Sequence, residues 1–188
     1  MKYEAIPAQL FTENRKRYTA QLQKNALAIF HANEEYTRSG DQTYTLHQNP
    51  DLFWLSGIDQ EESILLLFPD CAEKRYKEVL FLKQTNEHIA VWEGHKYTKS
   101  EAAKASGIPE SSIFWLQDYP TIKKMLMHWC SNVYLNSNEN DRYVFTASYR
   151  DLRLGLELMQ EYPFHSYHRS APIMRSLRPV KSEVEVQL

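Results

Sequence analysis

Histidine and carboxylate residues are the first candidates for chemistry in this sequence, because both types can bind metals or transfer protons. Among the seven histidines, His165 and His168 stand three residues apart. In a strand these two rings would point to opposite faces of a sheet, and two ligands do not close a metal site. The acids Asp59, Glu61 and Glu62 gather in a predicted turn, where solvated charge is the simplest interpretation. The sequence therefore predicts no metal ligand and no catalytic residue in this chain.

The motifs of other enzyme classes are missing as well. The sequence contains no GxSxG, HExxH or GxGxxG pattern and no phosphate-binding loop, and only 5 of its 188 residues are glycine. With 22 basic and 24 acidic residues, its net charge of −2 at pH 7 gives no basic surface for nucleic acid. We therefore expect neither a phosphate site nor a nucleic-acid partner.

Cysteine usage and hydropathy indicate the compartment. Cys71 and Cys130 have no CxxC partner, so a reducing environment fits better than a disulfide or metal framework. The N-terminus, MKYEAIPAQL, lacks the apolar core of a signal peptide, and no apolar run approaches the roughly 20 residues that a membrane span needs. The sequence predicts a cytoplasmic protein that makes no use of a membrane.

A polar arm followed by two apolar runs forms the stretch around which the rest of the chain is organised. The arm turns at Ser39-Gly40-Asp41 and then carries Tyr44, without a hydrophobic period. Ordered polar loops that are set on a sheet are where functional residues gather. The runs Leu52–Leu55 and Ile64–Phe68 are bounded by turn residues, which predicts two buried strands.

Helix and strand signals alternate along the chain. The four successive strands at 52–55, 64–68, 79–83 and 89–92 predict an antiparallel meander. The order of all the elements predicts an α/β domain with a mixed sheet. The segment 113–116 fits a short strand or a loop. The expected helices are 7–23, 99–106, one that Pro120 opens and one that follows Ser148, and the other expected strands are 26–31, 52–55, 64–68, 79–83, 89–92, 133–135 and 165–168.

Side-chain patterns predict which faces of these helices are buried. In the helix after Ser148, Leu152, Leu156 and Met159 fall on one face and mark a predicted buried stripe. The basic run at residues 15–17 fits a solvated helix face better than a binding patch.

Two capping boxes predict helix starts. Thr98 with Glu101, and Ser182 with Glu185, have the three-residue spacing that reciprocal hydrogen bonds require. The second box opens a helix within about two turns of Leu188, and helices that short are marginal in isolation. We therefore expect the protein to continue beyond Leu188.

The sequence resembles the N-terminal domain of aminopeptidase P (Xaa-Pro aminopeptidase), of the creatinase/prolidase family of pita-bread metallopeptidases, in four segments: TRSGDQTYTLHQNPDLFWLSG, ESILLLF, VWEGHKY and RPVKSEVEV. It departs from the family at Gln60-Glu61-Glu62, where relatives often have a proline after the position of Gly57. The resemblance implies an α/β fold with a mixed, mostly antiparallel sheet flanked by helices and a ribonuclease H-like motif. It also implies an N-terminal domain at residues 1–177, and at residues 178–188 a linker and the start of the first helix of a C-terminal catalytic domain.

The activity implied by this resemblance belongs to a longer protein. That protein would release the N-terminal residue from peptides with proline in second position, using two divalent metals, usually manganese, held by two aspartates, one histidine and two glutamates. All five ligands lie in the family's C-terminal domain, so the present chain alone is expected to be inactive and to hold no cofactor. The N-terminal domain would pack on the catalytic domain, shape the substrate entrance and build a homodimer or homotetramer.

Three residues match family positions near the substrate. Trp92 matches the tryptophan of a W-x-G motif that reaches toward the substrate pocket, although a core tryptophan at a strand end is an equal alternative. Asp41 and Tyr44 match a D-x-x-Y region of the arm. Asp41 could meet a substrate amino terminus or a neighbouring arginine, and an Asx-turn at Ser39-Gly40-Asp41 is its structural alternative.

Two other functions share the same domain. A prolidase or creatinase would use it with a different substrate, and prolidase would accept only dipeptides. A non-enzymatic pita-bread relative would use it as a binding module, like the histone-chaperone subunit with this fold. The near-neutral charge and the complete TRSGDQTY arm favour the aminopeptidase.

Overall fold

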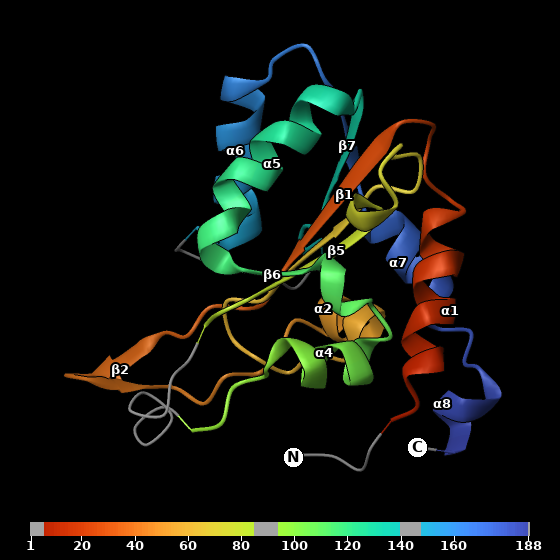
Figure 1. Ribbon diagram of the computed structural model, residues 1–188. Coiled ribbons are helices and arrows are strands. Elements are labelled where there is room, and N and C mark those ends of the chain that lie inside the picture. Colours follow the sequence, from red (N-terminus) through yellow and green to blue (C-terminus); the bar gives the residue numbers. More distant parts are fainter. Residues whose placement is uncertain (1–5, 85–93, 140–147, 188) are drawn as a thin grey trace.

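A six-stranded sheet forms the centre of the protein (Figure 1). The computed structural model describes residues 6–84, 94–139 and 148–187. The strand order is β6-β5-β4-β1-β7-β8, and a separate two-stranded arm is formed by β2 and β3. The strands are β1 (Ala26–His31), β2 (Thr37–Ser39), β3 (Gln42–Thr43), β4 (Ile64–Leu67), β5 (Glu78–Leu82), β6 (Ile113–Trp115), β7 (Asn132–Leu135) and β8 (Ser166–Arg169).

Parallel and antiparallel pairings are combined in this sheet, so the predicted mixed α/β fold is confirmed. β4 pairs antiparallel with β1 and with β5, whereas the β1–β7, β5–β6 and β7–β8 pairings are parallel. The expected antiparallel majority is therefore not observed among the described strands. Among the described residues, the β4–β5 pairing is the one part of the predicted meander that is observed. The strand predicted at 89–92 lies outside the described residues.

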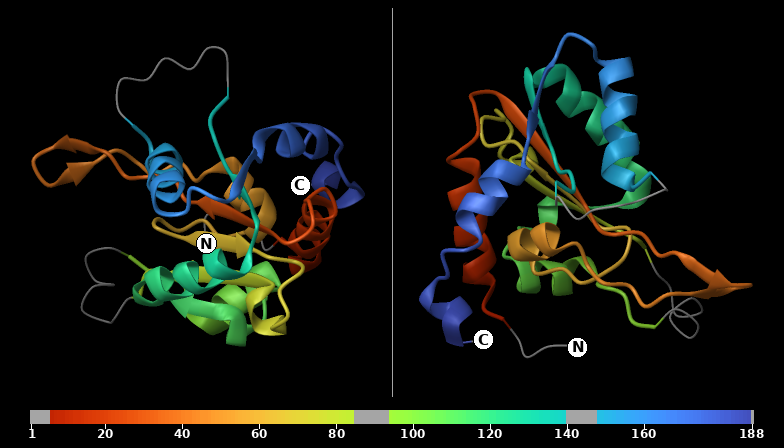
Figure 2. Two further views of the ribbon diagram at one scale, coloured as in Figure 1. Left: turned by 90° about the horizontal axis from the view of Figure 1, so that it is seen from above. Right: turned by 180° about the vertical axis from the view of Figure 1, so that it is seen from behind.

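Helices cover both faces of the sheet (Figures 1 and 2). α5 and α6 lie on one face, and α1, α2, α4 and α7 lie on the other. Within the described ranges, no helix is both long and apolar enough to cross a lipid bilayer. The helices are α1 (Ala8–Thr19), α2 (Pro50–Ser56), α4 (Lys99–Ser106), α5 (Tyr119–Trp129), α6 (Arg150–Glu161), α7 (Ala171–Leu177) and α8 (Glu183–Gln187).

Strand β1 separates the two halves of the core. Its side chains alternate, so that Ala28 and Phe30 pack on the α1 side while Leu27 and Ile29 pack on the α5 and α6 side. All six residues of β1 are buried, as expected for a central strand that is covered on both faces. This explains why the predicted strand at 26–31 is correct to the residue.

Residues 52–55 belong to helix α2, so the prediction of a strand there is wrong. The Asn49 side chain accepts hydrogen bonds from the backbone N–H groups of Asp51 (2.9 Å) and Leu52 (3.3 Å), which caps the helix at its start. Gly57 ends it in the left-handed conformation, with φ +69°. An apolar run of four residues is too short for its periodicity to distinguish a helix from a strand. Here the residues that cap both ends favour the helix.

The buried face of α6 also differs from the prediction. Leu152, Leu156 and Met159 are exposed, with 61% of Leu156 accessible to solvent, whereas Leu154 and Leu158 pack against the sheet. Leucines at 152, 154, 156 and 158 offer two possible apolar faces, and the sheet covers the one that the pattern did not favour.

Arg15 is fully buried, so the solvated face predicted for residues 15–17 is wrong at this position. Its guanidinium donates hydrogen bonds to the carbonyl oxygens of Leu55 (2.8 Å) and Ser106 (3.0 Å), and to the Glu78 carboxylate (2.9 Å). The two carbonyls lie at the C-terminal ends of α2 and α4, where backbone acceptors lack partners and a cation is favoured.

Candidate functional site

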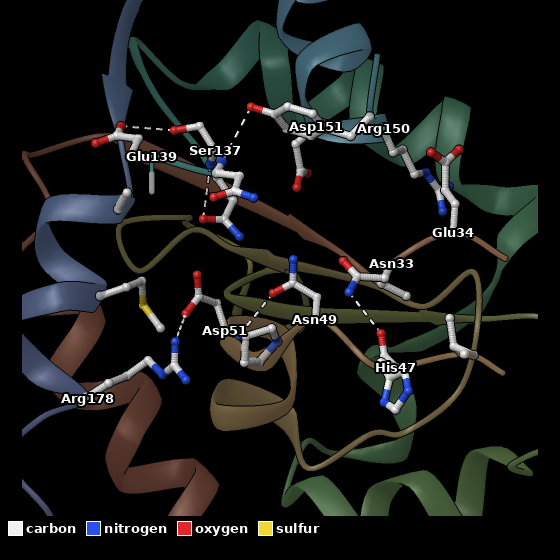
Figure 3. A pocket seen from close by; sticks show the side chains of 18 of the residues that line it. Asn33, Glu34, His47, Asn49, Asp51, Ser137, Glu139, Arg150, Asp151 and Arg178 are labelled. Carbon is white, nitrogen blue, oxygen red and sulfur yellow. Dashed lines mark hydrogen bonds and ion pairs between the residues drawn. The ribbon is translucent and has the colours of Figure 1, made fainter. Parts of the chain in front are cut away.

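A cleft of about 1080 Å³ opens at the edge of the sheet where β1 and β7 end (Figure 3). These two strands are parallel, so their carboxyl ends share one edge, which is the usual ligand position in α/β proteins. The N-terminal ends of α2 and α6 form part of the wall, and residues 178–181 complete it. The cleft is therefore built from segments that lie far apart in the sequence.

Four carboxylates line this cleft, and each has a basic partner. Two of the partners, Arg175 and Arg178, line the cleft themselves, and both come from the C-terminal end of the chain. The pairs are Asp51–Arg178 (2.8 Å), His31–Asp151 (2.7 Å), Arg175–Glu139 (2.5 Å) and Arg153–Glu34. Each of these four acids is therefore engaged in an ion pair or a hydrogen bond with a basic side chain.

Burial dominates the electrostatics of the two central pairs. It raises the pKa of Asp51, while Arg178 and the Asn136 side chain act in the opposite direction. It lowers the pKa of His31, although Asp151 opposes this shift. His31 is therefore neutral near pH 7, and because a carboxylate only accepts, its Nδ1–H donates to Asp151.

Neither cysteine is activated as a nucleophile. Burial raises the pKa of the Cys130 thiol to about 12 and also raises that of Cys71, which leaves neither as a thiolate near neutral pH. In the part of the chain that the structure describes, no group of three or more histidines, cysteines or acids could hold a metal ion.

Comparison with known proteins assigns the fold to a family. A family profile described as "Aminopeptidase P, N-terminal domain" matches residues 11–134, about two-thirds of the chain. This chain belongs to the aminopeptidase P N-terminal domain family.

Two curated bacterial proteins are similar to part of the chain. The Xaa-Pro aminopeptidase of Haemophilus influenzae is 25% identical over 117 residues, which cover 62% of this chain and 26% of that protein. The Xaa-Pro aminopeptidase of Escherichia coli is 27% identical over 109 residues, which cover 58% and 24%. The chain thus matches only about a quarter of the length of these relatives.

Solved structures of aminopeptidase P proteins share the fold. A Bacillus anthracis protein assigned as an aminopeptidase P superposes with a TM-score of 0.86 at 21% identity, covering 97% of this chain and 42% of that chain. The aminopeptidase PepP of Pseudomonas aeruginosa gives a TM-score of 0.77 at 23% identity, covering 97% and 40%. Because both identities are below 25%, these structures support the fold of the aminopeptidase P N-terminal domain and nothing finer.

The structure describes two of the three family-derived residues, Tyr44 and Asp41, and only Tyr44 is among the residues that line the cleft. Tyr44 stands at the base of the arm, 60% exposed, and lines the cleft. Asp41 lies in the turn between β2 and β3, exposed and away from the cleft lining. Trp92 lies outside the described residues.

Several cleft residues were missed by sequence reasoning. Tyr36 also lines the cleft, and its carbonyl accepts a hydrogen bond from the backbone N–H of Tyr44 (2.9 Å). The two tyrosines bracket the arm at a spacing of eight residues, a signal that was available in the sequence. The pairing of Asp51 with Arg178 left no such signal, because 127 positions separate the two residues.

Proposed function

We propose that this chain is the N-terminal, non-catalytic domain of a Xaa-Pro aminopeptidase, a metalloexopeptidase that releases the N-terminal residue before proline. The observation that carries the proposal is the family match over residues 11–134, supported by curated relatives that are named Xaa-Pro aminopeptidases. Residues 1–177 are then the domain itself. Residues 178–188 lead into a catalytic domain that supplies two manganese ions, and the complete enzyme is a cytoplasmic homodimer or homotetramer.

The metal chemistry of such an enzyme does not involve the described residues. The four cleft carboxylates are engaged in pairs, and the described residues offer no group of three or more metal ligands, which is consistent with a metal-bound step in the following domain. What the metals supply there is a hydroxide for attack on the scissile carbonyl. This chain contributes binding surface around that step.

The arm and the cleft are the surfaces proposed to shape the substrate entrance. The β2–β3 arm projects from the body of the domain in all three ribbon views (Figures 1 and 2). Every residue of both arm strands is exposed, and Tyr44 at its base leads into the cleft. Tyrosine offers an apolar ring and a hydroxyl at low entropic cost, which suits contact with a peptide that contains proline.

Peptide hydrolysis tests this proposal directly. The longer protein that contains this chain should release the first residue from Xaa-Pro tripeptides and longer peptides when manganese is added, and the 188-residue chain alone should not. Cleavage limited to dipeptides would identify a prolidase-type enzyme instead. Absence of cleavage by the metal-loaded longer protein would contradict the enzymatic proposal and favour a binding module.

Substitution of the family-derived residues tests the entrance role. In the longer protein, Trp92→Ala and Tyr44→Ala should raise KM for peptides beyond the dipeptide, because each removes an aromatic contact from the entrance. Trp129→Ala on α5, where the tryptophan is exposed but outside the cleft lining, is the control. Unchanged kinetics at every peptide length would remove Trp92 and Tyr44 from the entrance.

A further inference from the structure

The segment 177–187 leaves the sheet but remains packed against α1 and α2. Arg17 of α1 donates hydrogen bonds to the carbonyl oxygens of Leu177 (3.0 Å) and Val180 (3.4 Å). Its guanidinium also lies over the ring of Trp54, 5.5 Å from the centroid. One arginine thus holds the end of α7 and the connector that follows it against α1, and the same guanidinium contacts α2.

A single carboxylate joins α8 to this assembly. The Trp54 indole Nε1–H donates to Glu185 Oε1 (2.9 Å), and Trp54 is 8% exposed. The other oxygen, Oε2, accepts from the Ser182 backbone N–H (2.8 Å) and the Ser182 hydroxyl (2.9 Å). Glu185 therefore caps its own helix with one oxygen and bonds to α2 with the other.

Helix α2 contacts this segment at two places on one of its faces. Asp51 binds Arg178 at the beginning of the connector (2.8 Å), and Trp54, three residues further along α2, binds α8. α2 is itself held in place, since the buried Asn14 side chain donates to the Trp54 carbonyl (2.9 Å). The helix against which the connector packs is therefore itself anchored to α1.

These contacts decide whether α8 is ordered. A helix of five residues is far below the roughly 12 residues at which an isolated helix becomes marginal. Burial alone would raise the pKa of Glu185, but hydrogen bonds from Ser182 and Trp54 outweigh it and lower the pKa. The carboxylate that makes both contacts is thus held ionised at neutral pH.

We propose that Trp54 and Glu185 form a latch that fixes the segment 177–187 on α1 and α2, and that this latch sets the direction in which the following domain leaves. The first part stands on the contacts of this chain alone, and the second rests on the proposed function. Trp54 and Glu185 act as positioning residues in this arrangement. Asp51 and Arg178, which anchor the beginning of the same segment, also line the cleft.

Backbone dynamics of the 188-residue chain test the latch itself. In Trp54→Phe, which removes the indole donor and keeps an aromatic ring, the Val186 amide should exchange with solvent about tenfold faster, as expected for one hydrogen bond to a charged group. Trp129→Phe is the matched control and should leave this rate unchanged. Glu185→Ala should loosen α8 without touching the core, and Glu183→Ala, on the same short helix, should have a smaller effect. Equal exchange in wild type and both latch variants would overturn the proposal.

Solution scattering of the longer protein tests the second part without relying on activity. Trp54→Phe should increase the radius of gyration by broadening the distribution of distances between domains, while Trp129→Phe should not. If Trp54→Phe leaves the scattering profile unchanged but speeds amide exchange in α8, the latch is supported and its effect on the direction of the following domain is refuted. A longer protein that lacks peptidase activity but shows both effects would refute the proposed function and leave the latch standing.

Discussion

The guanidinium of Arg15 donates hydrogen bonds to three different elements of the domain. It has no solvent exposure, and it satisfies the last turns of α2 and α4 together with Glu78 at the start of β5. Breaking a buried, hydrogen-bonded charge leaves several polar groups without partners, which costs more than the bond itself. The stability of the α1 layer should therefore depend strongly on this one side chain.

Arg15→Met should lower the free energy of unfolding by about 3 kcal/mol or more, because the Leu55 and Ser106 carbonyls lose their donor inside the core. Urea denaturation followed by circular dichroism measures this change. Lys16→Ala, at an exposed position beside it, should stay within about 0.5 kcal/mol of wild type. A loss for Arg15→Met as small as that of the control would contradict the role assigned to Arg15.

His31 makes the stability of the domain dependent on pH. Its folded pKa is lowered by burial beneath the ordinary value near 6.5, so below that pH the unfolded chain binds more protons than the folded one. Stability should fall as the pH drops below about 6.5, by up to about 1.4 kcal/mol per pH unit. His31→Gln should flatten this slope in urea titrations between pH 7.5 and 5.5, whereas the exposed His47→Gln should not. A slope equal to that of wild type would rule out His31 as its source.

At the scale of elements, the glycine that ends α2 can be compared with the glycine in the turn of the β2–β3 arm. Gly57 has φ +69°, and a Cβ at this position would come within 2.3 Å of the Phe11 ring. Gly40 has a similar φ of +57° but no atom within 4 Å of such a Cβ. An added Cβ would therefore meet both backbone strain and steric overlap at Gly57, but backbone strain alone at Gly40.

Gly57→Ala should lower the free energy of unfolding by about 2–5 kcal/mol, because left-handed backbone strain of about 1–2 kcal/mol adds to overpacking of about 1–3 kcal/mol. Gly40→Ala should show the strain alone, about 1–2 kcal/mol. Chemical denaturation of the two variants in parallel gives the comparison. Equal costs would mean that the Phe11 ring moves aside freely.

The orientation of α6 is tested by two leucines that lie two residues apart. Leu158→Ala should cost about 2–5 kcal/mol, since a fully buried leucine leaves a cavity behind. Leu156→Ala, which shortens a side chain that is 61% exposed, should change the free energy of unfolding by less than about 0.5 kcal/mol. A larger loss of stability for Leu156→Ala than for Leu158→Ala, in thermal or urea unfolding, would indicate that α6 buries the face that the sequence pattern favoured.

Sequence reasoning succeeded for elements whose boundaries are marked by local chemistry. The capping boxes at Thr98 and Ser182 are both present, and the predicted strand at 26–31 agrees with β1. It failed where a short apolar pattern was compatible with two structures, as at 52–55 and on α6. Helix α7 was not predicted, because its seven residues are too few to show a helical period and no side-chain cap marks its start.

At the scale of the whole molecule, the cleft was beyond prediction from the residues. Its central pairs join positions 120 and 127 residues apart, and no local spacing encodes such contacts. The fold class and the family could be predicted, because the motifs that carry the resemblance are contiguous segments. Tyr44 was named only through that resemblance; it lines the cleft, and its contact with a substrate stays a prediction.

Buried side chains on one face of helix α1 connect it to the rest of the domain. Asn14, Arg15 and Tyr18 reach α2, α4 and Ser170 from one short helix, and a brief turn connects it to β1. The domain should therefore tolerate a chain break between α1 and β1. A synthetic peptide of residues 1–23 should reassociate with residues 24–188 in calorimetric titration, and Arg15→Met in the peptide should weaken that affinity at least tenfold. Failure of the two fragments to recombine would show that covalent continuity, and not these side chains, holds the first helix in place.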